Sequence, residues 1–120
     1  MKGADQMKAE IYKYGPLSCA MVLTETLKKS YQGEIYKEKL EDAESQLNHE
    51  VSVVGYKVDK VTGNEYWVVR NTLGTNWGDM GFLYIQMHAD NLGIETECIS
   101  GIPTFTKPAA NGISQTEFIQ

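Results

Sequence analysis

The chain has 120 residues, of which 42% are hydrophobic and 22% are charged, and its formal net charge is −5 at pH 7. This length allows one domain that buries roughly two thirds of the surface of its unfolded chain. The acidic balance argues against a general nucleic-acid-binding protein, because no basic stripe is present to neutralise phosphates. No apolar run approaches the roughly 20 residues that a bilayer span needs, so we expect no membrane partner.

Lys2 is not followed by an apolar core, so we expect no signal peptide within this sequence. The two cysteines, Cys19 and Cys98, could form one bridge, remain buried thiols or include a nucleophile, and composition alone favours buried, inert thiols. We find no zinc-type spacing of cysteine and histidine, no phosphate-binding glycine loop and no paired carboxylates. The sequence therefore predicts no cofactor and no metal site.

Residues 5–14 are predicted to form a short helix that Asp5 caps, because three apolar side chains recur at helical spacing. These side chains are Met7, Ile11 and Tyr14. Gly15 and Pro16 give the stop signal, and the apolar run 17–23 indicates a buried strand. A helical turn, a brief extended segment and a charged loop are predicted next, at residues 24–30, 33–36 and 37–46.

Two runs rich in β-branched and aromatic residues, 48–56 and 65–71, are predicted to be paired strands. The turn between them contains Gly63 and Asn64, which can take positive φ and reverse the chain. Pairing the strands about the middle of this turn brings His49 to within about two residues of the position opposite Asn71. The two side chains could then form a hydrogen bond.

An amide that accepts a hydrogen bond from one ring nitrogen of His49 would fix its tautomer and leave the other nitrogen able to take a proton. Such a pair is half of a nucleophilic catalytic unit. The alternatives are that His49 is a structural strand residue and that Asn71 is a turn residue at a strand end. His88 has no evident partner in the sequence and is interpreted as a surface residue.

Residues 72–81 contain three glycines and Trp77, which predicts a tight loop around a large ring. Trp77 is either simple core or a shield that keeps water from the His49–Asn71 bond. Residues 82–87 are predicted to form another strand, and 91–94 a turn into a segment that holds Cys98. The predicted fold class is α+β, with a mostly antiparallel sheet of four or more strands and a short N-terminal helix.

Three stretches together resemble the histidine and asparagine regions of papain-like cysteine peptidases. They are Asn48–Tyr56, Tyr66–Asn71 and Gly74–Phe82. The segment from Met7 to Cys19 is similar to the cathepsin X (cathepsin Z) branch in particular, and the whole resemblance runs from about residue 5 to about residue 103.

The resemblance implies that residues 1–105 form the C-terminal, barrel-like half of such a peptidase, the right-hand domain of the papain fold. Residues 106–120 would then be a surface or flexible tail. By this resemblance His49 is the general base and Asn71 the amide that orients it. The supporting residues implied by the same match are Trp77, Gly74 and Gly78.

Ala20 and Glu50 fall where the family lines its substrate cleft. The resemblance also implies a disulfide between Cys19 and Cys98, and with it a lysosomal or secreted location. The family's nucleophilic cysteine and oxyanion-hole glutamine belong to an N-terminal half that this sequence does not contain. Leu73 replaces a tryptophan of the family motif, which removes an aromatic cover from Asn71.

Two functional hypotheses follow. In the first, the chain is an enzyme half that an N-terminal peptidase half or companion chain completes for peptide hydrolysis, and it is inactive alone. In the second, it is a non-catalytic binding or structural module derived from a peptidase. A half domain exposes an apolar face, which predicts a bound partner or a homodimer. An unrelated β domain with a chance histidine is a third alternative.

Overall fold

The computed structural model describes residues 2–74 and 76–100. In this part of the chain two α-helices, α1 (Ala4–Tyr14) and α2 (Glu25–Ser30), accompany one sheet whose strands run in the order β2-β5-β4-β3-β1-β6. The strands are β1 (Leu17–Met21), β2 (Ile35–Tyr36), β3 (His49–Val58), β4 (Glu65–Arg70), β5 (Phe82–Gln86) and β6 (Cys98–Ser100). A short 3-10 helix at Ala43–Ser45 interrupts the charged loop.

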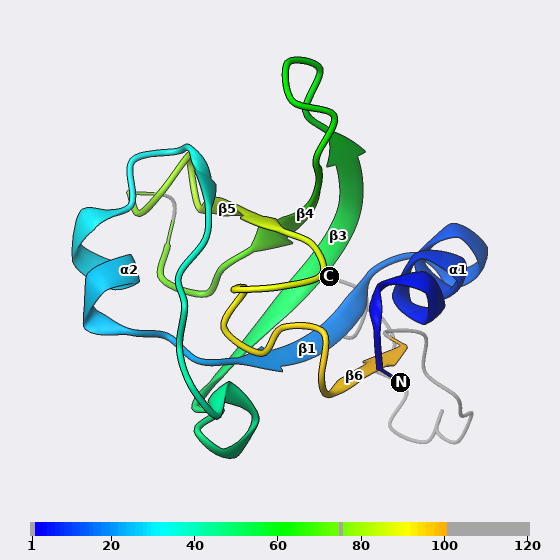
Figure 1. The fold of residues 1–120 in the computed structure, drawn as a ribbon, viewed down its shortest axis with the longest axis horizontal. Coiled ribbons are helices and arrows are strands. Elements are labelled where there is room, and N and C mark those ends of the chain that lie inside the picture. The colour runs from blue at the N-terminus through cyan, green and yellow to red at the C-terminus, as the bar shows by residue number, and fades with distance from the viewer. Residues whose placement is uncertain (1, 75, 101–120) are drawn as a thin grey trace, which may run out of the picture.

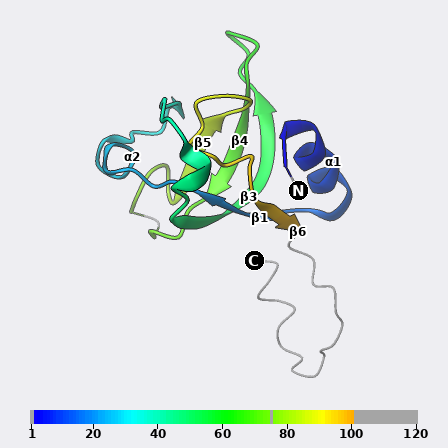
Figure 2. The same ribbon diagram turned by 60° about the horizontal axis from the view of Figure 1, so that its bottom comes forward.

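The sheet is antiparallel except for β2, which pairs in parallel with β5. Figure 1 shows α1 beside β1 and β3 at one side of the sheet and α2 at the opposite side. The turn between β3 and β4 projects from the body in both ribbon views (Figures 1 and 2). The predicted α+β class, with a short N-terminal helix and a mostly antiparallel sheet, is confirmed.

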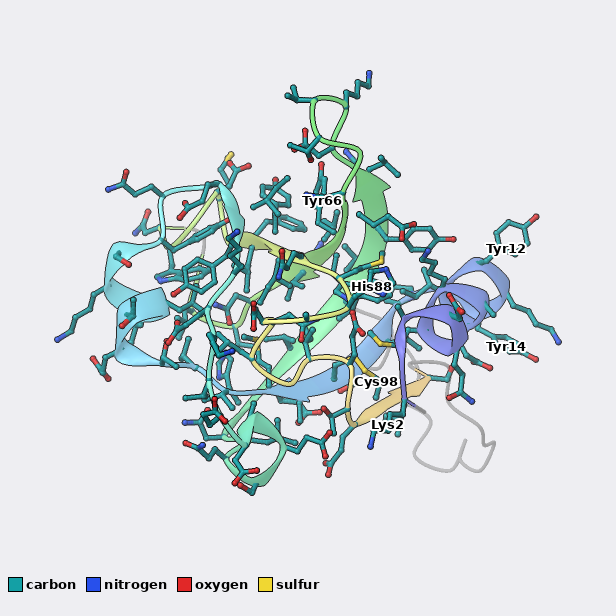
Figure 3. The ribbon with its side chains drawn as sticks, in the orientation of Figure 1. Lys2, Tyr12, Tyr14, Tyr66, His88 and Cys98 are labelled. Carbon is teal, nitrogen blue, oxygen red and sulfur yellow. A yellow bond between two sulfur atoms is a disulfide. The ribbon has the colours of Figure 1, made fainter. Side chains whose placement is uncertain are left out.

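Helix α1 begins one residue earlier than the sequence predicts. Gly3 is its N-cap, and Asp5 lies in the first turn without a capping hydrogen bond, so the prediction that Asp5 caps the helix is wrong. An acidic side chain there still interacts favourably with the positive end of the helix dipole. Met7 is fully buried, whereas Tyr14 at the last turn is 43% exposed because the helix end runs past the sheet (Figure 3).

The core lies where α1 and the loops pack against the inward face of the sheet. Strands β1, β4 and β5 alternate between buried and partly exposed residues, as expected for a sheet that covers one core. The largest fully buried side chains are those of Trp67, Met7, Leu17, Met21, Leu27, Leu83 and Ile85. Burial of this apolar surface is the main force that brings β1 and β3 into register.

The turn that joins β3 to β4 follows the prediction in part. The Asp59 backbone N–H donates to the Asn64 carbonyl oxygen at 2.8 Å, and Gly63 has φ +82°. Asn64 does not take positive φ, so that part of the prediction is wrong: one glycine is enough to reverse the chain.

The predicted tail, residues 106–120, lies outside the described residues. No helix in the described ranges is long and apolar enough to cross a membrane.

Candidate active site

His49 and Asn71 meet at the open end of the β3–β4 hairpin. The register pairs Ser52 with Arg70, so the position opposite Asn71 is Val51, two residues from His49. The His49 Nε2 and Asn71 Oδ1 atoms are 2.6 Å apart, a short hydrogen bond. The geometry predicted for this pair is therefore present.

The direction of this hydrogen bond is fixed by a second donor. The Thr72 backbone N–H donates to Asn71 Oδ1 at 2.8 Å, which identifies that atom of the amide as the oxygen acceptor. His49 Nε2 must therefore carry a hydrogen and donate it, and Nδ1 is left as the nitrogen that can accept a proton. Asn71 is only 7% exposed, so the bond lies largely away from water, where it is stronger.

The loop after Asn71 is closed by its own backbone. The Asn71 N–H donates to Gly81 O at 2.9 Å, and the Gly81 N–H donates to Trp77 O at 2.8 Å. Gly78 has φ +63°, and a Cβ there would lie 2.6 Å from the Phe82 carbonyl oxygen. Only glycine fits this position. Gly74 also has positive φ but faces open space.

Trp77 anchors this loop to α2. Its ring stacks on Tyr31 with centroids 5.3 Å apart, and its Nε1 donates to the Lys28 carbonyl oxygen at 2.9 Å. The ring is partly buried. These contacts support the loop that carries Asn71, while the predicted shielding of the His49–Asn71 bond stays a prediction.

Tyr31 is a supporting residue that the sequence analysis did not single out. Its hydroxyl donates to Glu34 O at 2.8 Å and accepts from the Tyr84 N–H at 3.0 Å. Burial raises the pKa of Tyr31 to about 12, so the hydroxyl stays protonated and keeps both bonds. Its only signal in the sequence is an aromatic residue directly after a short helix.

Two hollows are lined by residues at or next to this pair in the chain: Asn71 lines the first, and Glu50, the residue after His49, lines the second. One, of about 270 Å³, lies beside Asn71. Its lining is Arg70, Asn71, Gly74, Met80, Gly81 and Phe82. The other, of about 400 Å³, includes both predicted cleft residues, Ala20 and Glu50, whose Cα atoms are paired across β1 and β3. The structure therefore brings Ala20 and Glu50 together one residue from His49.

Cys19 and Cys98 form a disulfide between the paired strands β1 and β6, and both are buried. The disulfide that the family resemblance implies is therefore confirmed, and the expectation of inert thiols from composition alone is wrong, since β-sheet pairing brings the two residues face to face. The sequence has only these two cysteines, so neither is available as a nucleophile. In the described residues no group of three or more potential metal ligands comes together.

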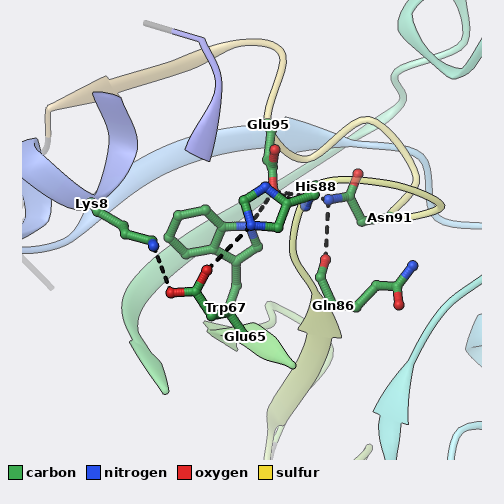
Figure 4. Close-up of polar contacts among 7 residues, drawn as sticks. All are labelled: Lys8, Glu65, Trp67, Gln86, His88, Asn91 and Glu95. Atoms are coloured by element: carbon green, nitrogen blue, oxygen red, sulfur yellow. Dashed lines mark hydrogen bonds and ion pairs between the residues drawn. The ribbon is translucent and has the colours of Figure 1, made fainter. Parts of the chain in front are cut away.

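His88 is exposed, as expected, but it has a partner that the sequence did not indicate. Its Nε2 lies 3.2 Å from Glu65 Oε1, and Lys8 Nζ lies 2.6 Å from Glu65 Oε2 (Figure 4). The hydrogen bond from Lys8 and then that from His88 hold the pKa of Glu65 below its usual value.

Glu95 completes this network on the other side of His88. Its Oε2 accepts from Trp67 Nε1 at 2.8 Å, from the His88 backbone N–H at 2.7 Å and from Asn91 Nδ2 at 3.1 Å (Figure 4). A carboxylate thus satisfies the one polar atom of a fully buried indole. The cluster is structural, and none of its hydrogen bonds involves His49 or Asn71.

Comparison with known proteins places these features in a family. Residues 1–102 match the model of the papain family cysteine proteases. The chain is 34% identical over 110 residues to a cathepsin Z of Onchocerca volvulus, which covers 86% of this chain and 35% of that protein. It is 35% identical over 101 residues to a gut-specific cysteine proteinase of Caenorhabditis elegans, which covers 83% of this chain and 29% of that protein. The chain thus spans about a third of the length of these relatives.

Two solved structures have the same fold in the matched region. Digestive procathepsin L 3 of Tenebrio molitor larval midgut superposes with a TM-score of 0.70 at 30% identity, over 82% of this chain and 32% of that one. Bromelain from Ananas comosus superposes with a TM-score of 0.67 over 80% of this chain and 44% of that one, and at 22% identity it shows the fold alone. The sheet of this chain is therefore that of papain-fold proteases, and the chain belongs to the papain family of cysteine proteases.

Proposed function

We propose that this chain supplies the histidine half of the active site of a papain-like cysteine peptidase. His49 acts as the general base and acid, and Asn71 holds its ring. The observation that supports this most directly is the 2.6 Å bond from His49 Nε2 to an amide oxygen whose identity a second donor fixes. A cysteine on an N-terminal half, covalently joined or as a companion chain, would face His49 Nδ1.

The reaction then follows from ordinary thiol chemistry. His49 Nδ1 takes the proton of the cysteine thiol, and the resulting thiolate attacks the carbonyl carbon of a peptide bond. The imidazolium gives its proton to the nitrogen of the leaving amine as the C–N bond breaks. Water, deprotonated by the neutral imidazole, hydrolyses the thioester and regenerates the thiol.

This proposal makes the chain inactive alone. Both of its cysteines are in one disulfide, so it offers no thiolate of its own. The same disulfide favours an oxidising compartment, and we propose a lysosomal or secreted location.

The alternative is a non-catalytic binding or structural module. Leu73, which stands two residues after Asn71 where the family motif has tryptophan, is 36% exposed and offers no aromatic cover. Such a module would bind a companion chain or form a homodimer without chemistry. Both proposals include the His49–Asn71 hydrogen bond. They differ in whether His49 takes part in catalysis.

Complementation distinguishes them. The chain is mixed with, or fused to, an N-terminal half from a papain-family peptidase, and hydrolysis of a fluorogenic peptide is measured with and without a thiol-alkylating reagent. We expect thiol-dependent activity only in the mixture, its loss in His49→Ala, and its retention in the matched control His88→Ala. Activity that persists in His49→Ala would remove the proposed mechanism, and an inactive wild-type mixture would favour the module.

A further inference from the structure

We propose that a third hollow, which neither His49 nor Asn71 lines, binds a guanidinium group. This hollow has a volume of about 660 Å³, which is within the usual range for a small-molecule site. Its lining comes from three segments: residues 2–3, residues 38–44 and the loop 88–96. Binding there would be a property separate from the proposed peptide hydrolysis.

Hydrogen bonds between these three segments hold the walls of the hollow in place. The Gly3 backbone N–H donates to the Glu95 carbonyl oxygen at 2.9 Å, which ties the N-terminal segment to the loop. The Glu38 N–H donates to the Asp90 carbonyl oxygen at 2.8 Å, which ties the second segment to the same loop. The hollow is therefore formed by the fold itself and does not need a ligand to shape it.

The lining contains a buried amide oxygen that has no partner. Asn91 is 8% exposed, and its Nδ2 donates to Gln86 O and to Glu95 Oε2, both at 3.1 Å. Two acceptors identify that atom as the nitrogen, so the other atom of the amide is the oxygen. In residues 2–74 and 76–100 no group donates to Asn91 Oδ1, and Figure 4 shows it pointing away from Gln86 and Glu95. Since an unsatisfied buried acceptor lowers stability, a ligand that donates to it is favoured.

The charge of the hollow favours a cation. Lys2 is the one lysine among the described lining residues, and its Nζ lies 3.7 Å from Glu44 Oε2 in a pair whose two side chains are 65% and 63% exposed. Such an exposed pair contributes little. Five carboxylates line the same hollow, so negative charge is in excess. They belong to Glu38, Asp42, Glu44, Asp90 and Glu95.

A guanidinium group matches these acceptors better than a metal ion does. In the described part of the chain no three potential metal ligands converge. A guanidinium is planar, always charged and carries five N–H donors, so it can donate to an amide oxygen and to a carboxylate at the same time. Glu95 holds Asn91 through Oε2, while its Oε1 accepts no hydrogen bond within residues 2–74 and 76–100 and is available beside the amide.

The test is a titration of the isotopically labelled chain at low ionic strength with two probes of the same shape, N-acetylarginine amide and its neutral isostere N-acetylcitrulline amide. Backbone amide shifts of residues 38–44 and 88–96 report binding in the hollow. We expect saturable shifts there with the arginine probe and a dissociation constant on the order of 1 mM. The citrulline probe should bind about fivefold more weakly, because it lacks the attraction to the carboxylates.

A charge variant tests whether the hollow causes this preference. Asp42 and Asp90 are exposed and have φ +55° and +51°, a region that asparagine also adopts. The double variant Asp42→Asn/Asp90→Asn should therefore fold, bind the arginine probe about fivefold more weakly and lose most of the preference over citrulline. The matched control Glu25→Gln/Glu34→Gln removes the same charge from exposed residues outside the lining and should keep the preference.

Asn91→Ala removes the amide oxygen itself and should abolish saturable binding. It also removes the bonds to Gln86 and Glu95, so if this variant does not fold, the charge variant decides. Equal affinities for the two probes, shifts confined to another surface, or no saturable shift would overturn the proposal. So would an unchanged preference in Asp42→Asn/Asp90→Asn.

The guanidinium group could belong to a small molecule or to an arginine side chain of another protein. A pentapeptide with one central arginine between glycines distinguishes these sources. Affinity at least about tenfold above that of N-acetylarginine amide would assign the hollow to a protein side chain, because the flanking backbone would then contribute. Equal affinity would assign it to a small molecule.

Discussion

At the scale of single residues, the candidate site depends on one oxygen atom. Asn71 Oδ1 accepts from both His49 Nε2 and the Thr72 N–H. Turning the amide over would point its NH₂ group at two donors, so the orientation is held by the backbone as well as by the ring. The imidazole is thereby kept in one tautomer, which is the preorganisation that the proposed general base requires.

Replacing Asn71 by alanine should leave the His49 ring free to adopt either neutral tautomer. In the wild-type chain with a neutral His49 ring, the ring ¹⁵N shifts should show a protonated Nε2 and a bare Nδ1. In Asn71→Ala they should show a mixture of tautomers, and peptidase activity of the complemented protein should fall about 10- to 100-fold. The His88 ring, which contacts Glu65 instead, is the internal control and should not change. A pure Nε2–H tautomer in the variant would show that Asn71 does not orient the ring.

Gly78 is the residue where the loop tolerates least change. A Cβ at this position would meet the Phe82 carbonyl oxygen at 2.6 Å, and φ is +63°. Gly78→Ala should therefore lower the free energy of unfolding by more than about 2 kcal/mol in urea denaturation. Gly33→Ala is the matched control: φ is +97° but nothing lies within 4 Å of its Cβ, so only the backbone term of about 1 kcal/mol remains. Equal losses in both variants would contradict the close approach.

The His49–Asn71 pair could be predicted from the sequence because the two residues lie on consecutive strands joined by a short turn. Spacing then fixes the register to within about two residues. The contact between Lys8 and Glu65 could not be predicted, because 57 residues separate them and the contact depends on how α1 packs against the sheet. The contact between His88 and Glu65 could not be predicted for the same reason.

At the scale of elements, a β-bulge in β3 is the feature that the sequence pattern did not reveal. The register shifts between Val53, which pairs with Val69, and Gly55, which pairs with Val68. Before the bulge the odd-numbered valines of β3 are buried, and after it Tyr56 packs edge-on against Trp67 with centroids 6.0 Å apart. One extra residue thus changes which parity faces the core, and strict alternation along residues 48–56 cannot describe the whole strand.

The ion pair between α1 and β4 should make stability depend on pH in a defined direction. The hydrogen bond from Lys8 lowers the pKa of Glu65 below its ordinary value of 4.5, so this contribution is present above pH 4.5 and is lost as pH falls through the lower folded value. The same hydrogen bond raises the pKa of Lys8 above 10.5, so its contribution is present below pH 10.5 and is lost as pH rises through the higher folded value. Urea midpoints measured across this range should therefore fall at both ends.

Glu65→Gln tests that assignment. This variant keeps the shape of the side chain but removes the charge that Lys8 and His88 contact, so the acidic decline in the urea midpoint should become shallower. Glu25→Gln is the control, because the Glu25–Lys29 pair is exposed and contributes little. An unchanged acidic decline in Glu65→Gln would assign the pH dependence to other carboxylates.

At the scale of the whole molecule, the disulfide joins the first strand of the sheet to the last one described. Cys19 and Cys98 are 79 residues apart, so the bridge removes much conformational freedom from the unfolded chain. The double variant Cys19→Ala/Cys98→Ala should lose about 4 kcal/mol of unfolding free energy. Treating the wild-type chain with a reducing agent should produce a similar loss, and the double variant should not respond to it. A response of the double variant would point to an effect of the reagent itself.

We expect the isolated chain to self-associate through exposed apolar side chains. Three large apolar side chains near the two hollows are exposed: Leu73 at 36%, Met80 at 74% and Ile99 at 66%. The chain spans about a third of the length of its relatives, and exposed apolar side chains of this size are typical of surfaces that associate. Light scattering over a concentration series should show dimers, and Met80→Ser with Ile99→Ser should weaken them about tenfold or more. Val61→Ser, in the projecting turn, removes an apolar side chain that is 90% exposed and should leave the dimer unchanged. A monomer at every concentration, or a dimer that depends on Val61, would show that this surface is not the one that associates.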